Sequence, residues 1–212
     1  MPRMQSLESP GAMVHIMARG LDGMCIFRQE EDKEVFLRRF TSHIADVGYH
    51  CYAWCLMDNH YHFFLRTNEL PMSRLMRPLN GGYARWFNRK YRRRGYVFQD
   101  RFKSVVCQDS AYARELIRYI HLNPLRAGYF GTVKALGRFR WSGHNYLTKG
   151  TCKWSSRFVS RNTAHARELI PISKIADFLG ITCSPAARLF RRGKGMFGKV
   201  TKRTCCATQL RS

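Results

Sequence analysis

The stretch that decides the fold is YHCYAWCLMDNHYHFFLRT, at residues 49–67. It contains two aromatic-rich runs, residues 49–57 and 61–67, on either side of the pair Asp58-Asn59. Apolar and aromatic runs of this length, separated by Asp and Asn, are typical of two strands joined by a tight turn. The stretch therefore predicts a β-hairpin.

The segments before the hairpin predict a strand and a helix. In residues 13–19 (MVHIMAR) apolar and other side chains roughly alternate, which predicts a strand, and Gly20 ends the run. Residues 30–47 carry acids at their start and apolar side chains at helical spacing. Gly48 follows as a glycine suited to a helix C-terminus.

Three further elements follow the hairpin. Residues 73–91 have apolar side chains at helical spacing, and residues 97–107 predict a fourth strand. A last helix, capped by Asp109 or Ser110, is expected to end before the Asn-Pro pair at 123–124. The order β-α-β-β-α-β followed by a helix predicts an α+β, ferredoxin-like (split βαβ) fold. One antiparallel sheet would have two helices on one face, and its other face or edge would be free for a ligand.

The charge indicates a polyanionic partner. Lys and Arg number 37 against 14 acids, which gives a formal net charge of +23 in 212 residues. Such an excess favours nucleic acid first and an acidic membrane surface second. The longest strongly apolar run, residues 51–57, is far shorter than the about 20 residues of a membrane-spanning helix, and no secretory signal is visible. We therefore expect a cytoplasmic, nucleoid-associated protein without a membrane partner.

The composition also predicts how the chain is divided. We expect a leader at residues 1–10, a main domain at 11–148, a basic extension at 160–195 and a disordered tail at 196–212. The extension resembles a helix-turn-helix, in which Arg188, Arg191 and Arg192 would face DNA. The alternative is a basic helical hairpin that packs on the main domain.

Two small groups of residues can carry chemistry. His60 and His62 lie two apart in a predicted strand, so both rings point to one face and could hold a metal ion. Tyr119 and Asn123 lie four apart in a predicted helix and therefore share its face. Taken alone, His60 and His62 are better read as two histidines with unrelated partners. Taken alone, Tyr119 is better read as a core aromatic residue and Asn123 as part of a helix stop.

An aromatic and basic stretch at residues 83–94 (YARWFNRKYRRR) can contribute to DNA binding. Aromatic faces stack on unpaired bases, and cations follow the phosphates of a single strand. Trp86 and Phe87 are expected to belong to the core, whereas the arginines are expected to face DNA.

Together these segments resemble the REP-associated tyrosine transposases, a branch of the single-tyrosine HUH (IS200-like) transposases. The resemblance covers about residues 11–146. Its motifs are ARG at 18–20, IF at 26–27, LMDNHYHFFL at 56–65, LNGGYARWFNR at 79–89, GYVFQDRFKS at 95–104, RYIHLNPLRAG at 118–128 and WS at 141–142. The chain departs from the usual pattern at Leu21, Asp58, Asp100 and Gly143, where the family often has Asn, Pro, Gly and Ser.

The resemblance implies a mechanism. His60, His62 and Asn123 would bind Mg²⁺ or Mn²⁺, and Tyr119 would attack DNA to give a 5′-phosphotyrosine and a free 3′-hydroxyl. The substrate would be single-stranded DNA beside a hairpin formed by a palindromic repeat. Two alternatives are a domesticated hairpin-binding protein without cleavage activity, and another HUH nuclease such as a replication initiator or relaxase. Monomer and homodimer both stay open. The residues expected to contact DNA are Arg19, Arg85, Arg89, Arg92, Arg93, Arg94, Arg101, Lys103, Arg118, Arg188, Arg191 and Arg192.

Overall fold

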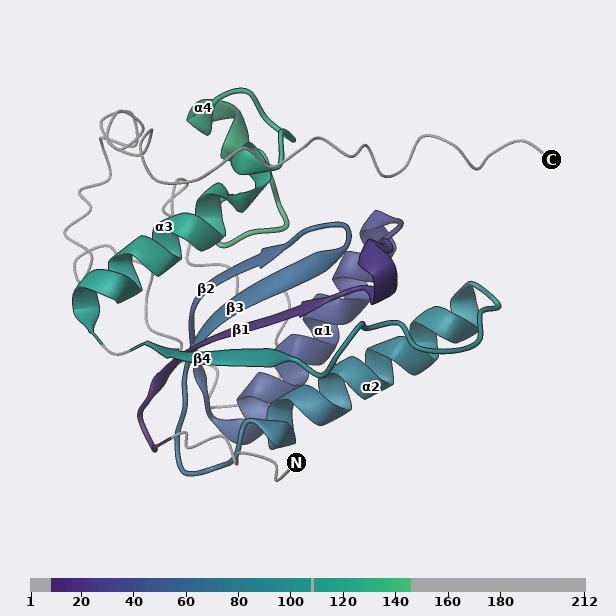
Figure 1. Cartoon of the computed structure of the whole chain (residues 1–212), viewed down its shortest axis with the longest axis horizontal. Helices are drawn as coiled ribbons and strands as arrows, with labels where there is room; N and C mark the ends of the chain where they lie inside the picture. The colour runs from purple at the N-terminus through teal and green to yellow at the C-terminus, as the bar shows by residue number, and fades with distance from the viewer. Residues whose placement is uncertain (1–8, 108, 146–212) are drawn as a thin grey trace.

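The computed structural model describes residues 9–107 and 109–145. Most of the predicted leader, the extension with Arg188, Arg191 and Arg192, and the predicted tail lie outside the described residues. Four strands form one antiparallel sheet in the order β2-β3-β1-β4 (Figure 1). Their bounds are β1 Met13–Arg19, β2 His50–Leu56, β3 His60–Arg66 and β4 Lys103–Cys107. This order confirms the predicted α+β, split βαβ fold.

Helices α1 (Glu30–Val47) and α2 (Ser73–Lys90) pack against each other on one face of the sheet. At the start of α1, the side chain of Asp32 accepts hydrogen bonds from the backbone N–H groups of Arg28 and Gln29. At its end, Gly48 adopts the left-handed conformation, with φ of 69°, that the sequence led us to expect. A short 3-10 helix, η1 (Leu21–Gly23), follows β1.

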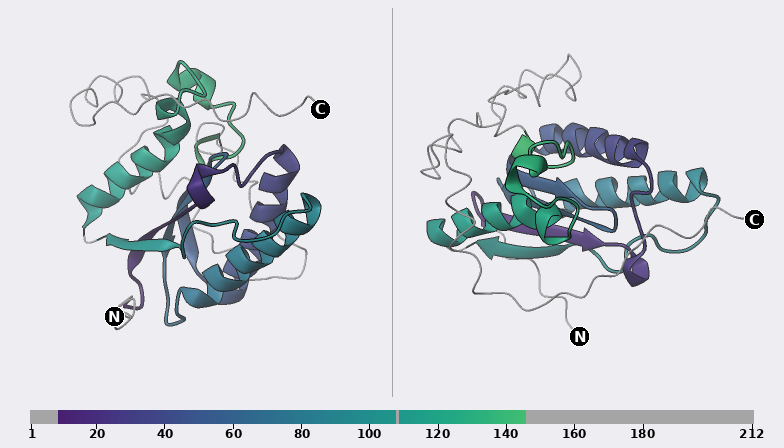
Figure 2. Two further views of the ribbon diagram at one scale, coloured as in Figure 1. Left: turned by 45° about the vertical axis from the view of Figure 1, so that its right-hand side comes forward. Right: turned by 90° about the horizontal axis from the view of Figure 1, so that it is seen from above.

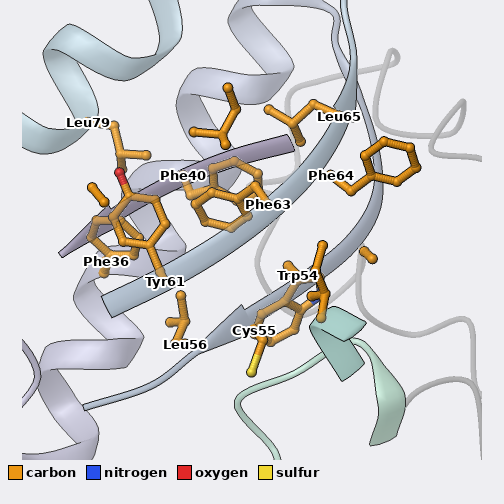
Figure 3. Packing of buried hydrophobic residues seen from close by; sticks show 14 of the residues in the cluster. Phe36, Phe40, Trp54, Cys55, Leu56, Tyr61, Phe63, Phe64, Leu65 and Leu79 are labelled. Carbon is orange, nitrogen blue, oxygen red and sulfur yellow. The ribbon is translucent and has the colours of Figure 1, made fainter. Parts of the chain in front are cut away.

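The core lies between these two helices and the sheet, and β3 supplies its centre. Tyr61, Phe63 and Leu65 are fully buried, and Figure 3 shows them beside Phe36 and Phe40 of α1. The rings of Phe63 and Phe40 stack with centroids 3.9 Å apart. Because side chains alternate along a strand, burying these three residues sends His60 and His62 to the opposite face.

That opposite face carries α3 (Ser110–Arg126), which contacts β2, β3 and β4 (Figure 2). A short helix, α4 (Val133–Leu136), follows it. Beyond α4 the chain reaches the free edge of β2, where Leu56 N–H donates to Trp141 O and Gly143 N–H donates to Trp54 O. The face expected to be free for a ligand is therefore partly covered by α3.

The predicted fourth strand was too long. Between the pairs Met17–Lys103 and Gly20–Phe98, β1 advances three residues while the partner segment advances five. The two extra residues interrupt the ladder, so β4 begins only at Lys103.

The predicted end of α3 was also wrong. The helix passes through Pro124 and ends at Arg126, and Ala127 N–H still donates to Asn123 O. A proline inside a helix has no N–H and so removes one backbone hydrogen bond. Asn123 and Pro124 are both buried, which offsets that loss. Asn123 consequently stays helical, one turn after Tyr119.

Candidate metal and nucleophile site

His60 and His62 lie side by side on the sheet face that α3 covers. Their ring centroids are 5.0 Å apart and their planes are nearly perpendicular, at 89°. The intervening Tyr61 points to the other face, where its hydroxyl donates to Asn80 Oδ1 at 2.7 Å. The alternation predicted from the sequence thus places the two imidazoles together.

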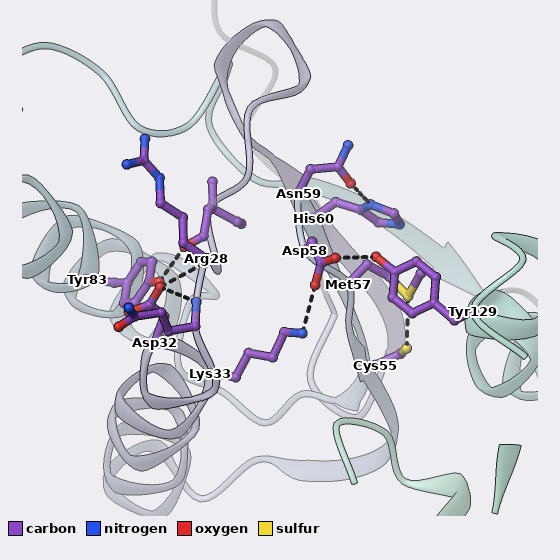
Figure 4. A network of polar contacts seen from close by, with 12 residues as sticks. Arg28, Asp32, Lys33, Cys55, Met57, Asp58, Asn59, His60, Tyr83 and Tyr129 are labelled. Carbon is purple, nitrogen blue, oxygen red and sulfur yellow. Dashed lines mark hydrogen bonds and ion pairs between the residues drawn. The ribbon is translucent and has the colours of Figure 1, made fainter. Parts of the chain in front are cut away.

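Each imidazole is held by a neighbour. Asn59 Oδ1 lies 2.6 Å from His60 Nδ1, as Figure 4 shows, and His15 Nε2 lies 2.9 Å from His62 Nδ1. His15 comes from β1, where it is buried. Hydrogen bonds of this kind fix the tautomer and ring orientation of histidines that bind metals.

The sequence analysis missed His15. Its position in β1 puts it on the same face as Met17 and Arg19, but its meeting with His62 depends on the register between β1 and β3. Alternation within β1 could have placed His15 on the same face as Arg19, a residue that the sequence analysis already expected to contact DNA.

Helix α3 brings Tyr119 and Asn123 to the same place. The side chain of Asn123 lies near enough to the His60 ring to raise its pKa slightly against the larger effect of burial. The Tyr119 ring meets His62 edge-on with centroids 5.6 Å apart, and it lies 6.4 Å from His15. Side chains from three separate segments therefore converge on one face of the sheet.

One arginine packs on the tyrosine ring in an arrangement that the sequence did not reveal. The guanidinium of Arg126 lies over the Tyr119 ring, 5.1 Å from its centroid. Arg118, expected to contact DNA, is partly buried and forms an ion pair with Glu115 one turn earlier.

Burial keeps the imidazoles of the site neutral. It lowers the pKa of His15 and of His60 to about 4, and the positive charge of Arg19 also lowers that of His60. The pKa of His62 lies well below its usual value because of burial and then of the neighbouring His60 and His15. The neutral imidazole is the form that binds a metal ion, so at neutral pH these rings are ready to act as ligands.

The donor atoms present fit a metal ion. His62 Nε2 is buried and has no hydrogen-bond partner, which leaves one imidazole nitrogen available. Within residues 9–107 and 109–145 no group of three His, Cys, Asp or Glu side chains could hold a metal. A metal site here would therefore need a third ligand of another kind, and the amide of Asn123 on α3 lies near the His60 ring.

The residues predicted to bind DNA are divided between the two faces of the sheet. Arg19 pairs with His60 across the β1–β3 ladder, and Lys103 pairs with Met17 across the β1–β4 ladder. Directly paired residues of antiparallel strands point to the same side. Arg19 and Lys103 therefore lie on the site face, and both are exposed, as is Arg101.

The arginines of α2 are not brought to that face. Arg85 and Arg89 are exposed on a helix that packs on the opposite side of the sheet. The next turn contains exposed Arg92 and Arg94 and a partly buried Arg93, whose guanidinium lies 5.8 Å from the Phe87 ring centroid. Phe87 is buried as expected, whereas Trp86 is only partly buried.

Within residues 9–107 and 109–145, the helices are all too short or too polar to cross a membrane.

Comparisons with known proteins agree with this fold. A family model described as "Transposase IS200 like" matches residues 9–123. The fold is similar to a solved structure of a REP-associated tyrosine transposase bound to a REP hairpin, with a TM-score of 0.54 at 13% sequence identity. That similarity covers 71% of this chain and 87% of the other. No curated protein matches the sequence.

Proposed function

Because the chain belongs to the IS200-like transposase family, we propose that it cuts and rejoins single-stranded DNA beside hairpins formed by palindromic repeats. The observation that carries this proposal is the convergence of Tyr119 and Asn123 with His60 and His62. A nucleophile and a set of metal ligands on one face are the parts that such a reaction needs.

In this proposal His60, His62 and Asn123 hold Mg²⁺ or Mn²⁺. When bound, such an ion supplies positive charge that polarises a phosphate oxygen and stabilises the transition state. Asn59 and His15 orient the two imidazoles. Asn123 would also link the metal site to the nucleophile, because it lies on α3 together with Tyr119.

The reaction replaces one phosphodiester bond, between two nucleotides, by another, between the DNA and Tyr119. The phenol oxygen of Tyr119 loses its proton and forms a bond to phosphorus, while the bond from phosphorus to the 3′-oxygen of the preceding nucleotide breaks. That 3′-oxygen takes up a proton and leaves as a hydroxyl, and the 5′-phosphate stays on the tyrosine. Attack by another 3′-hydroxyl reverses these steps and joins two strands.

The cations of the site face would guide the DNA. Arg19 is exposed beside His60 and Lys103 is exposed one strand farther along the same face, where both can contact phosphates near the scissile bond. The similar solved structure is that of a protein bound to a REP hairpin. We therefore propose a hairpin substrate here too, with the arginines of α2 and the following turn contacting the backbone farther from the cleavage point.

The test is covalent adduct formation. The full chain is incubated with Mn²⁺ and a DNA hairpin that carries a single-stranded extension, and the products are run on a denaturing gel. The wild type should give a protein–DNA adduct, Tyr119→Phe should give none, and Tyr112→Phe should behave as the wild type. Tyr112 is a matched control because it lies exposed at the start of the same helix. Hairpin binding by a wild type that forms no adduct would instead identify a domesticated DNA-binding protein.

A further inference from the structure

One carboxylate joins three parts of the chain beside the candidate site. Asp58 lies in the β2–β3 turn, two residues before His60, and its Oδ1 accepts a hydrogen bond from Lys33 Nζ at 2.8 Å. Its Oδ2 accepts one from the Tyr129 hydroxyl at 2.7 Å, as Figure 4 shows. Its backbone carbonyl accepts from the N–H groups of Ile26 and Phe27, at 2.8 and 2.9 Å. The turn is thereby held by α1, by the segment before α1 and by the segment after α3.

Tyr129, one of the residues that Asp58 binds, is attached to α3, the helix that carries Tyr119. Tyr129 follows α3 by three residues, and its N–H donates to Pro124 O at 2.9 Å. Gly128 makes the required bend with φ of 78°, a conformation that favours glycine. The residue whose hydroxyl reaches Asp58 is therefore hydrogen-bonded through its backbone to the last turn of α3.

Lys33, the other residue that Asp58 binds through its side chain, is buried and needs the Asp58 carboxylate as its counter-charge. The Lys33 side chain is only 10% exposed, and its ammonium lies 5.8 Å from the Trp141 ring centroid and 6.0 Å from that of Phe139. A buried ammonium is costly unless a counter-charge is close, and Asp58 supplies it. The carboxylate is consequently fixed in place and presents its second oxygen to Tyr129.

Burial and the charge of Asp58 raise the pKa of Tyr129, so its hydroxyl keeps its proton and acts as the donor. A hydrogen bond from a neutral hydroxyl to a carboxylate is stronger than one between two neutral groups. The contact can therefore hold the end of α3 against the turn that leads into β3.

From this geometry we infer that Asp58 is a positioning residue. It holds the end of the Tyr119 helix, through Tyr129, against the turn that begins the His60–His62 strand, and so sets how the nucleophile meets the metal ligands. This inference rests on the proposed function, because it assigns a role in the same reaction. Misplacing a reacting group by about 1 Å costs up to roughly a hundredfold in rate.

The variant that isolates the contact is Tyr129→Phe, which removes one hydroxyl and keeps the ring against Phe139. Tyr112→Phe, on α3, is the matched control. Three quantities are measured for each full-length protein: amide hydrogen exchange in α3, the dissociation constant for hairpin DNA, and the adduct rate at saturating DNA. Asp58→Asn serves as a second variant, because it leaves Lys33 without its counter-charge.

A positioning role predicts a specific combination of results. In Tyr129→Phe, exchange should become faster in the second half of α3 but not in α1 or α2. The adduct rate should fall roughly tenfold to a hundredfold, while hairpin affinity stays within about twofold, and Asp58→Asn should lose at least as much rate. Unchanged exchange in α3, or faster exchange with an unchanged adduct rate, would overturn the inference alone. A wild type that forms no adduct would overturn the proposed function together with it.

Discussion

Acidification should destabilise the protein, and His15 should account for a measurable part of the loss. This histidine is buried in β1 against His62, and burial lowers its pKa from 6.5 to about 4. In the unfolded chain the ring is free to take up a proton near its ordinary pKa. Between the two values the unfolded chain binds more protons than the folded protein does.

The sign of the effect follows from that difference. A group whose pKa is lower in the folded state contributes stability that is fully present above its unfolded pKa, here 6.5. The contribution is lost as the pH falls toward the folded value of about 4 and changes little below it. The shift corresponds to about 3 kcal/mol in all, of which about 2 kcal/mol should be lost between pH 7 and pH 5.

The assay is urea unfolding at several pH values in that range, on the wild type and on His15→Gln. Glutamine keeps a polar group near His62 but does not titrate, so the free energy of unfolding of His15→Gln should depend less steeply on pH. The other buried histidines remain in both proteins. The difference between the two slopes therefore measures the contribution of His15 to the pH dependence of unfolding. Equal slopes for wild type and His15→Gln would refute the reasoning.

Two further predictions concern the backbone after β1 and the basic surface. In Gly20→Ala the new Cβ would lie 2.2 Å from Met24 O, so the variant should lose about 1–3 kcal/mol of unfolding free energy. Gly131→Ala, in open space, should change it by less than about 0.5 kcal/mol; equal losses in the two variants would contradict this. If exposed Arg89 contacts a phosphate, Arg89→Gln should reduce the salt slope of hairpin binding by about 1, whereas Arg38→Gln on α1 should not; an unchanged Arg89→Gln slope would remove that residue from the DNA-binding surface.

The order of elements could be predicted because each has a strong local signal. Strand β1 and helix α1 have the bounds that alternation and helical spacing predicted, and the hairpin turns at Asp58-Asn59. The two errors arose where tertiary contacts outweigh local preference. Two extra residues interrupt the ladder before β4, and buried packing carries α3 past Pro124.

The candidate site was predictable to a similar extent. The shared face of His60 and His62 follows from the strand period, and that of Tyr119 and Asn123 from the helix period. The partner of His62 did not follow, because the contact with His15 depends on the register between strands 47 residues apart. The ties from Asp58 to Lys33 and Tyr129 span 25 and 71 residues, and no local pattern indicates them.

The proposed ligands also explain how the charge at the site would suit DNA. Two neutral imidazoles and a carboxamide would leave the full double charge of a divalent ion uncompensated, whereas carboxylate ligands would cancel part of it. Arg19, paired with His60 across the ladder, adds positive charge and helps to lower the pKa of that ring. The same positive potential that attracts a phosphodiester therefore also opposes protonation of the ligands. The proposed ligand set without carboxylates, in a chain of net charge +23, would thus leave the bound ion free to attract a phosphate.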